Sequence, residues 1–183
     1  MDCSGFIYYV LTQAGYKDVP RDSSEQYAWV RQNNDFQSVL SRSQDSFELK
    51  DLKPGDLMFW SGTYKSNRDI PITHVMIYLG KEKATGKPVM VGATDGRSYD
   101  GIRRSGVSVF DFKMPSGQPD KNDPDLIAKF EGYGSIPGMR GSDVITHVSL
   151  IQRSNSEKSN AHESSSPHKK STAKKKKSVE PDN

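Results

Sequence analysis

Residues 2–15 have the sequence DCSGFIYYVLTQAG, and this stretch predicts a helix on which the rest of the chain is organised. Asp2 can cap the helix, because its carboxylate can accept a hydrogen bond from a free backbone N–H of the first turn. Gly15 suits the left-handed conformation that often ends a helix. We expect one apolar face of the helix to pack against a core, because its residues recur every four positions. These residues are Phe6, Val10 and Ala14.

Cys3 lies in the first turn of this predicted helix and is the only cysteine of the chain. Free N–H groups and the positive end of the helix dipole favour an anion there. We therefore expect its thiol to have a pKa below the value of about 8.5 that a free cysteine has. Such a thiol is a candidate nucleophile if a histidine can reach it. The alternative is that Cys3 is a small buried apolar residue.

His74 is the histidine best placed to serve Cys3. It lies at the start of the strongest strand pattern of the chain, THVMIYLG at 73–80, directly after a polar loop. An imidazole at such a strand end could take the thiol proton and later protonate a leaving amine. Alternatively, His74 is a structural residue. His147 stands in a similar context, Ile-Thr-His-Val at 145–148, and is a weaker candidate base.

Helical patterns come first in the chain, and strand patterns follow. A second short helix is predicted through residue 30, with Ser23 as its cap and Gln26 completing a capping box. Residues 31–46 are expected to be mostly loop, and a glycine-rich loop is expected at 95–106. Strands are predicted within 52–60, 73–80, 89–94, 107–112 and 126–133. This order predicts an α+β domain with an antiparallel sheet.

The end of the chain differs in composition from the rest. Residues 153–183 are rich in Ser and Lys and carry a formal charge of +4, whereas residues 1–152 carry −1. A segment with so few apolar residues cannot offset the entropy cost of folding. We therefore divide the chain into a domain at 1–142, a terminal strand or linker at 143–152 and a disordered basic tail at 153–183. The tail is either a solvated extension or an electrostatic arm for an anionic polymer.

Several classes of site have no support in the sequence. No aromatic residues are interleaved with the lysines of the tail, so no specific nucleic-acid partner is expected. No run is long and apolar enough to span a membrane. Four scattered histidines and one cysteine lack the spacing of metal ligands. No glycine-rich phosphate loop opens a helix, so neither a metal nor another cofactor is predicted.

Four blocks of the sequence, in this order, resemble the NlpC/p60 family of papain-like cysteine peptidases, which act on bacterial cell-wall peptides. The blocks are DCSGF at 2–6, Pro20-Arg21 with Ser23 and Gln26, LKPGDL at 52–57 and HVMIYLG at 74–80. The resemblance implies a papain-like α+β fold in which the nucleophile helix packs on a small antiparallel sheet. It also implies an acyl-enzyme on Cys3, with His74 as the base. The substrate bond implied is an amide of the D-glutamyl-diaminopimelate type in peptidoglycan stem peptides.

The resemblance carries further expectations about the site and its location. It implies a secreted, periplasmic or cell-wall-associated protein, whose tail would then meet an anionic wall polymer. It also implies a chain truncated at its N-terminus, because family members carry a preceding segment whose tyrosine contributes to the oxyanion hole. The candidate substrate-binding residues are Asp2, Ser4, Arg21 and Trp60. Of these, Arg21 could hold a substrate carboxylate, and Trp60, together with Tyr64, could form the side of the cleft.

The residue that orients the histidine in the family falls on Gly92 in this chain, and glycine has no side chain for that role. Thr94 lies on the same predicted strand face and is the candidate that replaces it. Asp95, a water molecule or a backbone carbonyl are alternatives, because the second ring N–H needs only an acceptor. Two other functions stay open. One is a non-catalytic cell-wall-binding domain of the same fold, and the other is a different papain-like amide chemistry, such as amidase or acyl transfer.

Overall fold

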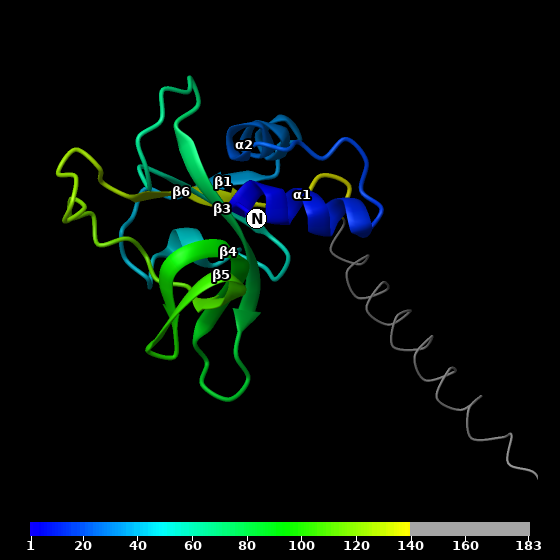
Figure 1. The fold of residues 1–183 in the computed structure, drawn as a ribbon. Coiled ribbons are helices and arrows are strands. Elements are labelled where there is room, and N and C mark those ends of the chain that lie inside the picture. The colour runs from blue at the N-terminus through cyan, green and yellow to red at the C-terminus, as the bar shows by residue number, and fades with distance from the viewer. Residues whose placement is uncertain (140–183) are drawn as a thin grey trace, which may run out of the picture. The chain divides into compact units, whose positions relative to one another are not determined.

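The computed structural model describes residues 1–139, which form two α-helices and one antiparallel sheet (Figure 1). The helices are α1 (Cys3–Gln13) and α2 (Ser23–Gln32), and a short 3-10 helix follows at Phe47–Leu49. The strands are β1 (Phe36–Ser38), β2 (Leu57–Ser61), β3 (Ile72–Lys81), β4 (Pro88–Tyr99), β5 (Ile102–Asp111) and β6 (Lys129–Gly134). The predicted α+β class is confirmed.

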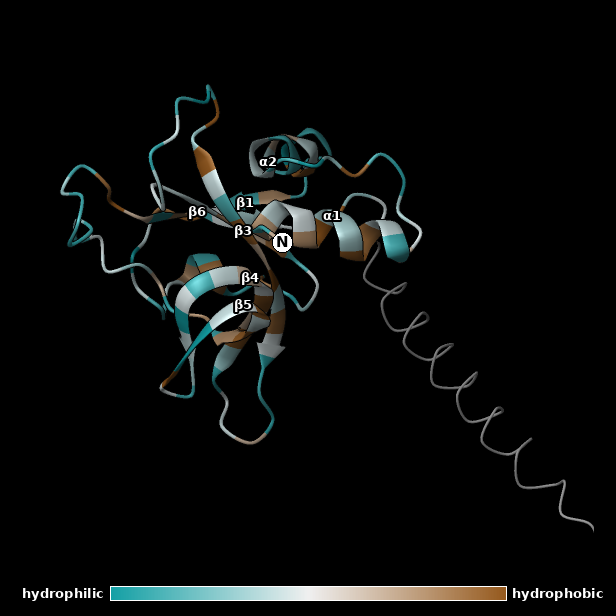
Figure 2. Ribbon diagram, in the orientation of Figure 1, coloured by the Kyte–Doolittle hydropathy of each residue, from teal (hydrophilic) through white to brown (hydrophobic). Residues whose placement is uncertain are grey.

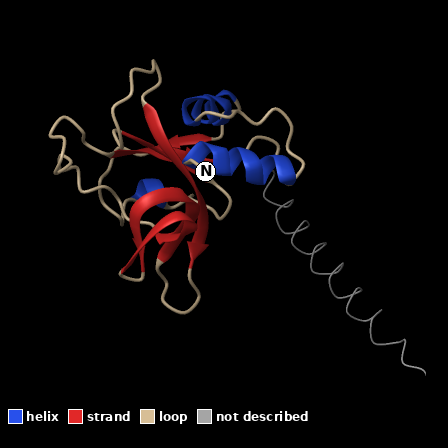
Figure 3. Cartoon of the chain, in the orientation of Figure 1, coloured by secondary structure: helices blue, strands red, loops and turns tan. Residues whose placement is uncertain are grey.

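The six strands lie in the order β1-β6-β2-β3-β4-β5, and every neighbouring pair is antiparallel. Strand β3 therefore lies inside the sheet, between β2 and β4. Helix α1 contacts both β3 and β4, and α2 contacts β3, as the arrangement of helices and strands in Figure 3 shows. The start of α1 is thus placed beside the strand that carries His74.

The central strands are buried on both faces of the sheet. Leu57 and Phe59 of β2 pack with the two helices, whereas Met58 and Trp60 pack into a second apolar cluster on the opposite face. This double burial explains why residues 57–60 form an uninterrupted apolar run rather than an alternating one. In Figure 2 the loops and hairpin tips are mainly hydrophilic, and the hydrophobic residues gather on α1 and the central strands.

Helix α1 begins and ends where the sequence predicts. Asp2 is the N-cap, and its carboxylate accepts a hydrogen bond of 2.6 Å from the Gly5 N–H. Gly15 follows the last turn with a positive φ of 91°. These two residues satisfy backbone groups that would otherwise have no partner at the helix ends.

The buried face of α1 differs by one position from the predicted face. Ile7 and Leu11 are buried, whereas none of the three predicted residues, Phe6, Val10 and Ala14, is fully buried. Both stripes have the same four-residue spacing, so periodicity alone does not distinguish them. The buried stripe continues back to Cys3, which packs beside the apolar cluster under the helices. The burial of α1 therefore turns its only thiol toward the sheet.

Helix α2 is capped differently from the prediction. The N-cap is Asp22, not Ser23, and no capping box forms. Ser23 is the first helical residue, and its hydroxyl donates to the Ile72 carbonyl at 3.2 Å. Gln26 is fully buried, and its amide donates to the Ser4 carbonyl at 3.0 Å. A carboxylate is a stronger acceptor than a serine hydroxyl, which leaves Ser23 and Gln26 to tie α2 to β3 and α1.

Strands β4 and β5 form a long hairpin where the sequence predicts a glycine-rich loop at 95–106. The strands are joined by Asp100 and Gly101, whose positive φ values of 49° and 80° fit a two-residue hairpin turn. The Asp-Gly dipeptide is the sequence signal for this turn. A second glycine, Gly96, has φ of 75° and lies at a register shift between Asp95 and Arg97. Two of the three glycines at 95–106 therefore mark a turn and a β-bulge, and the third, Gly106, pairs with Thr94 inside the continuous hairpin.

Two further strands differ from the predictions. Strand β1 lies within residues 31–46, where mostly loop is predicted, because a strand of three residues carries too short a pattern to detect. Strand β6 begins at Lys129 rather than at residue 126. The predicted terminal strand or linker at 143–152, with His147, and the predicted tail at 153–183 lie outside the described residues.

Candidate active site

A pocket of about 480 Å³ opens beside the start of α1. Its lining includes Cys3 from α1, His74 from β3, Thr94 and Arg97 from β4, and Tyr64 from the loop before β3. We call it the nucleophile pocket. The predicted nucleophile and the predicted base are therefore brought to one cavity, although they lie far apart in the sequence.

Cys3 is partly buried in this pocket. Burial raises the pKa of its thiol, and the backbone N–H groups of Val75 and Ser4 oppose that shift without cancelling it. The predicted lowering of the thiol pKa is therefore wrong, because the cost of desolvating a thiolate outweighs the helix terminus here. The thiol carries its proton at neutral pH and needs a base before it can attack.

His74 is buried opposite Trp60 of β2, and the two ring centroids lie 5.6 Å apart. Burial, and after it the positive charge of Arg97, lowers the pKa of His74 to about 3. The imidazole is therefore neutral at neutral pH, which is the form that can accept a proton. Within residues 1–139, no hydrogen bond joins His74 to Cys3. The pocket thus holds a neutral thiol and a neutral imidazole.

The Nε2 atom of His74 is buried and has no hydrogen-bond partner in the described part of the chain. Thr94 and Asp95 both line the pocket, but neither donates to nor accepts from the ring. A Cβ built on Gly92 would lie 3.0 Å from the Cε of Met76, so an apolar side chain fills the space beside this glycine. No hydrogen bond between Thr94 and the His74 ring supports the predicted orienting role of Thr94, which stays a prediction.

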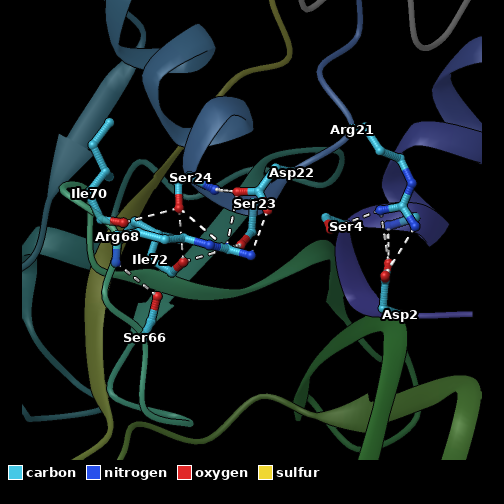
Figure 4. Close-up of polar contacts among 11 residues, drawn as sticks. Asp2, Ser4, Arg21, Asp22, Ser23, Ser24, Ser66, Arg68, Ile70 and Ile72 are labelled. Atoms are coloured by element: carbon cyan, nitrogen blue, oxygen red, sulfur yellow. Dashed lines mark hydrogen bonds and ion pairs between the residues drawn. The ribbon is translucent and has the colours of Figure 1, made fainter.

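Arg21 clamps the start of α1, as Figure 4 shows. Its Nη1 and Nη2 atoms donate to the two carboxylate oxygens of Asp2, each at 3.0 Å, and Nη1 also donates to the Ser4 hydroxyl at 3.2 Å. The hydrogen bond from Arg21 holds the pKa of Asp2 below its usual value. A Cβ on Gly5 would lie 2.6 Å from Asp2 Oδ1, so a larger residue at this position requires the Asp2 and Arg21 side chains to move. Three predicted substrate-binding residues are thus bound to one another next to Cys3.

A second arginine forms the same kind of pair at the start of α2. Arg68 donates to the two carboxylate oxygens of Asp22 at 2.8 and 3.1 Å. In Figure 4 its guanidinium also lies beside Ser23 and Ser24, whose hydroxyls are 3.5 Å from Nη1. Both arginines line a smaller pocket of about 170 Å³ that shares Cys3 with the nucleophile pocket. Sequence reasoning missed Arg68, because the polar loop that carries it has no periodic pattern.

Trp60 has a different position from the predicted side of the cleft. It is fully buried and does not line the nucleophile pocket. Arg97 does line it, and its guanidinium carbon lies 5.0 Å from the centroid of the Trp60 ring. Sequence reasoning missed Arg97, since it lies in the segment predicted to be a glycine-rich loop. The signal that could have placed it is the Asp-Gly turn, which extends β4 past this residue.

The described residues offer no donor set for a metal ion, because no three His, Cys, Asp or Glu side chains gather within residues 1–139. Neither of the helices described here has the length and apolar character needed to cross a bilayer.

Comparison with known proteins gives one family. A model of the NlpC/P60 family matches residues 1–103, a range that contains Cys3, His74 and Arg97. The probable endopeptidase p60 of Listeria seeligeri is 36% identical over 106 residues, which cover 57% of this chain. The matched region spans 15% of the length of that relative. No solved structure matches the chain.

Proposed function

The chain belongs to the NlpC/P60 family, and from this premise we propose that it is a cysteine peptidase that hydrolyses amide bonds in peptidoglycan stem peptides. At the level of the family, it is related to cell-wall peptidases through the family model and the p60 relative. The papain-like arrangement, the acyl-enzyme on Cys3 and the D-glutamyl-diaminopimelate bond are the finer parts of the proposal.

One observation carries the proposal: Cys3 and His74 line the same pocket. The helix presents its only thiol beside β3 because the stripe of Ile7 and Leu11 packs against the sheet. A thiol and an imidazole in one cavity are the two groups that nucleophilic catalysis on an amide needs. Tyr64 lines the same pocket and is available to contact a bound peptide.

The first half of the reaction forms a thioester. The Nε2 atom of His74 is buried, so Nδ1 is the ring nitrogen that accepts the proton of the Cys3 thiol. The sulfur then attacks the amide carbonyl and a C–S bond forms. The C–N bond breaks as the imidazolium returns the proton to the departing amine. The backbone N–H of Cys3 is positioned at a helix start, where it can donate to the developing oxyanion.

The second half of the reaction releases the acyl group. A water molecule gives a proton to Nδ1 of His74 and attacks the thioester carbonyl. The C–S bond breaks, and the Cys3 sulfur regains the proton from the imidazolium. The sum of both halves converts one amide and one water into a carboxylic acid and an amine, and leaves the protein unchanged.

We place the protein outside the cytoplasm, in a secreted, periplasmic or cell-wall-associated position, because its proposed substrate is peptidoglycan. Support comes from the family, whose members are typically secreted or associated with the cell wall. The proposed partner is therefore the stem peptide, either in the wall or in released fragments. The lysine-rich residues expected to meet an anionic wall polymer lie outside the described part of the chain.

A non-catalytic cell-wall-binding domain of the same fold is the second candidate. The observation in its favour is that Nε2 of His74 has no acceptor within residues 1–139, while Gly92 supplies no side chain to orient the ring. An imidazole without an acceptor is held in its tautomer only by packing. In this case the pocket would hold a peptide without cleaving it.

Hydrolysis of a defined peptide separates the two candidates. The full chain, its Cys3→Ala variant and its His74→Gln variant are incubated with a glutamyl-diaminopimelate peptide, and the release of free amine is followed. A peptidase gives release that falls at least about 1,000-fold in both variants. The binding domain gives no release from any of the three proteins, yet the full chain sediments with isolated cell walls.

Alkylation of the single thiol tests the state of the pair. The rate of labelling by iodoacetamide is measured against pH in the full chain and in His74→Gln. Because burial raises the pKa of Cys3, we expect labelling to increase only above the pH at which a free thiol ionises. Rapid labelling below pH 7 that is lost in His74→Gln would mean instead that a thiolate–imidazolium pair is present.

A further inference from the structure

Arg97 differs from the other arginines around Cys3 because it has no carboxylate partner. Within residues 1–139, no Asp or Glu oxygen lies within 4.0 Å of its guanidinium. The side chain is nevertheless partly buried, and burial lowers the pKa of Arg97. Its one described contact is the ring of Trp60, which is fully buried beneath it. A cation that is desolvated without a counter-ion costs stability, so the fold alone does not account for it.

The β-bulge at Gly96 aims Arg97 into the pocket. Asp95 pairs with Ser105 and Arg97 pairs with Arg104, which leaves Gly96 as the extra residue. Successive residues of a strand point to opposite faces, so the two pairings place Asp95 and Arg97 on opposite faces of the hairpin. The nearest carboxylate in the sequence, that of Asp95, also lines the pocket but lies more than 4.0 Å from the Arg97 guanidinium. The bulge requires glycine, because Gly96 has φ of 75°.

The charged residues around Arg97 do not neutralise its positive charge. Arg104 lies directly opposite Arg97 on β5, which is an unfavourable pairing of like charges. Its own guanidinium stacks on Tyr99 at 4.3 Å and donates to the Ser108 hydroxyl at 3.2 Å. Asp2, which also lines the pocket, is already paired with Arg21. An anion that enters the pocket therefore meets a guanidinium with free donors, and no carboxylate of the described residues lies within 4.0 Å of that guanidinium, although Asp95 also lines the pocket.

The group that fits this site is a carboxylate. A guanidinium presents planar N–H donors that match the two oxygens of a carboxylate, and such charge-assisted bonds are stronger in a partly desolvated place. The stem peptides of the proposed function contain glutamate and diaminopimelate, which have more carboxyl groups than the scissile amide uses. A carboxylate on Arg97 also offsets the charge that, after burial, lowers the pKa of His74. Substrate binding then makes His74 a better base.

We infer that Arg97 binds a free carboxylate of the substrate, so that the nucleophile pocket selects peptides that carry this group near the scissile amide. The inference rests on the proposed function and deepens it, because it names a feature of the substrate and the residue that recognises it.

The test compares two peptides and three substitutions. One is a glutamyl-diaminopimelate peptide with free carboxylates, and the other is the same peptide with carboxamides in their place. The values of kcat/KM are measured for the full chain, Arg97→Gln, Arg97→Lys and Arg103→Gln. Arg103→Gln is the matched control, because it removes the same charge from the same hairpin at an exposed residue that does not line the pocket. Thermal unfolding of each variant confirms that it is folded.

We expect the full chain and Arg103→Gln to prefer the carboxylate peptide by roughly 10- to 100-fold. Arg97→Gln loses this preference, mainly through a higher KM, and Arg97→Lys restores part of it. A full chain that cleaves both peptides equally, or an Arg97→Gln variant that keeps the preference, overturns the inference while the proposed peptidase function stands.

Binding of the two peptides to the Cys3→Ala variant tests the role of Arg97 separately from the proposed peptidase function. If the full chain cleaves neither peptide, the proposed function fails, and calorimetry with Cys3→Ala then decides about Arg97. Tighter binding of the carboxylate peptide that disappears in the Cys3→Ala, Arg97→Gln double variant supports the inference without any hydrolysis. Equal binding of the two peptides, or no binding of either, overturns it.

Discussion

Arginines lie on two sides of Cys3, in the nucleophile pocket and in the smaller pocket beside it, and the two sides hold them in different ways. On the helix side, Arg21 and Arg68 each make two hydrogen bonds to a carboxylate that caps a helix. On the hairpin side, Arg97 lies on an aromatic ring and has no carboxylate within reach in the described residues. The paired arginines fix helix starts, whereas the unpaired one is available to a ligand.

Solvent access sharpens this contrast. The paired side chains of Arg21 and Asp2 are 55% and 62% exposed, so water screens their attraction and the pair adds little to stability. Arg97 is the more buried cation, and it is the one without a partner. A charge placed where it costs most and pairs least is typical of a functional site rather than of a structural one. Four predictions test this difference between the two sides.

Acid should have the largest effect on stability, and it acts through His74 of β3, whose pKa the charge of Arg97 helps to lower. The pKa of His74 is about 3 in the folded protein and about 6.5 in the unfolded chain. Between these values only the unfolded chain takes up the proton, so stability is lost as the pH falls below about 6.5. We expect the folded protein to lose roughly 3 kcal/mol more than His74→Gln between pH 7 and pH 4, measured by urea unfolding at each pH. Equal losses in both proteins would mean that His74 is protonated in the fold.

A methyl group added at Gly5, under the Arg21 clamp, should have the next largest effect on stability. In Gly5→Ala, the new Cβ would meet Asp2 Oδ1 at 2.6 Å and Arg21 Nη2 at 2.7 Å. We expect a loss of about 2 kcal/mol, typical of overpacking, with the clamp opened and the start of α1 displaced. Urea unfolding measures the loss, and Tyr9→Ala on the exposed face of the same helix is the control. A Gly5→Ala protein as stable as the control would show that the clamp moves aside freely.

Removal of the unpaired charge of Arg97 should raise the stability of the protein, in contrast to the two changes above. Arg97→Met keeps an apolar side chain over Trp60 but removes a cation that burial disfavours, so we expect a gain of about 1 kcal/mol in the free energy of unfolding. Arg21→Met, on the helix side, should lose a few tenths of a kcal/mol. The two variants are compared by thermal unfolding in one buffer. A loss of stability in Arg97→Met would place that arginine among the structural ones.

Substitutions of Asp2 should have the smallest effect on stability. They distinguish the contribution of the N-cap from that of the ion pair with Arg21. Asp2→Ala removes both the N-cap bond to Gly5 and the pair with Arg21, and should cost about 1 kcal/mol. Asp2→Asn keeps a side-chain acceptor for the cap and loses only the exposed pair, so it should cost a few tenths of a kcal/mol. Thermal unfolding at low and high salt measures both. If Asp2→Asn costs as much as Asp2→Ala, the pair with Arg21 is worth more than its exposure suggests.

The first helix and the strand that carries His74 could be predicted because their signals are local. Asp2 caps the helix by a bond to a residue three positions away, and residues 73–80 form a long apolar strand pattern. Cys3 and His74 could therefore be named as partners before their positions were known. Their common pocket depends on the packing of α1 against β3, which no local pattern contains.

The parts that could not be predicted depend on competition or on distance. Two apolar stripes of α1 have equal spacing, and only the surface they meet decides between them. Asp22 and Ser23 both suit a cap, and the choice depends on the Ile72 carbonyl, which takes the Ser23 hydroxyl. The helix terminus favours a lower pKa of Cys3 and burial favours a higher one. Burial decides the outcome, and the depth of burial is not visible in a sequence. Arg97 was hidden because glycines in a bulge and a turn resemble a loop.

The tight turn at Asp100 and Gly101 has a consequence for how such a protein can change over time. It closes the β4–β5 hairpin at a tip where an exposed aspartate and an exposed glycine meet solvent. Chain tips of this kind tolerate insertion and exchange far better than packed segments do. The residue inferred to choose the substrate is thus carried on an appendage that can be lengthened or replaced. The nucleophile helix belongs to a different part of the chain from this hairpin. Substrate preference and the reactivity of Cys3 can therefore change independently in descendants of this domain.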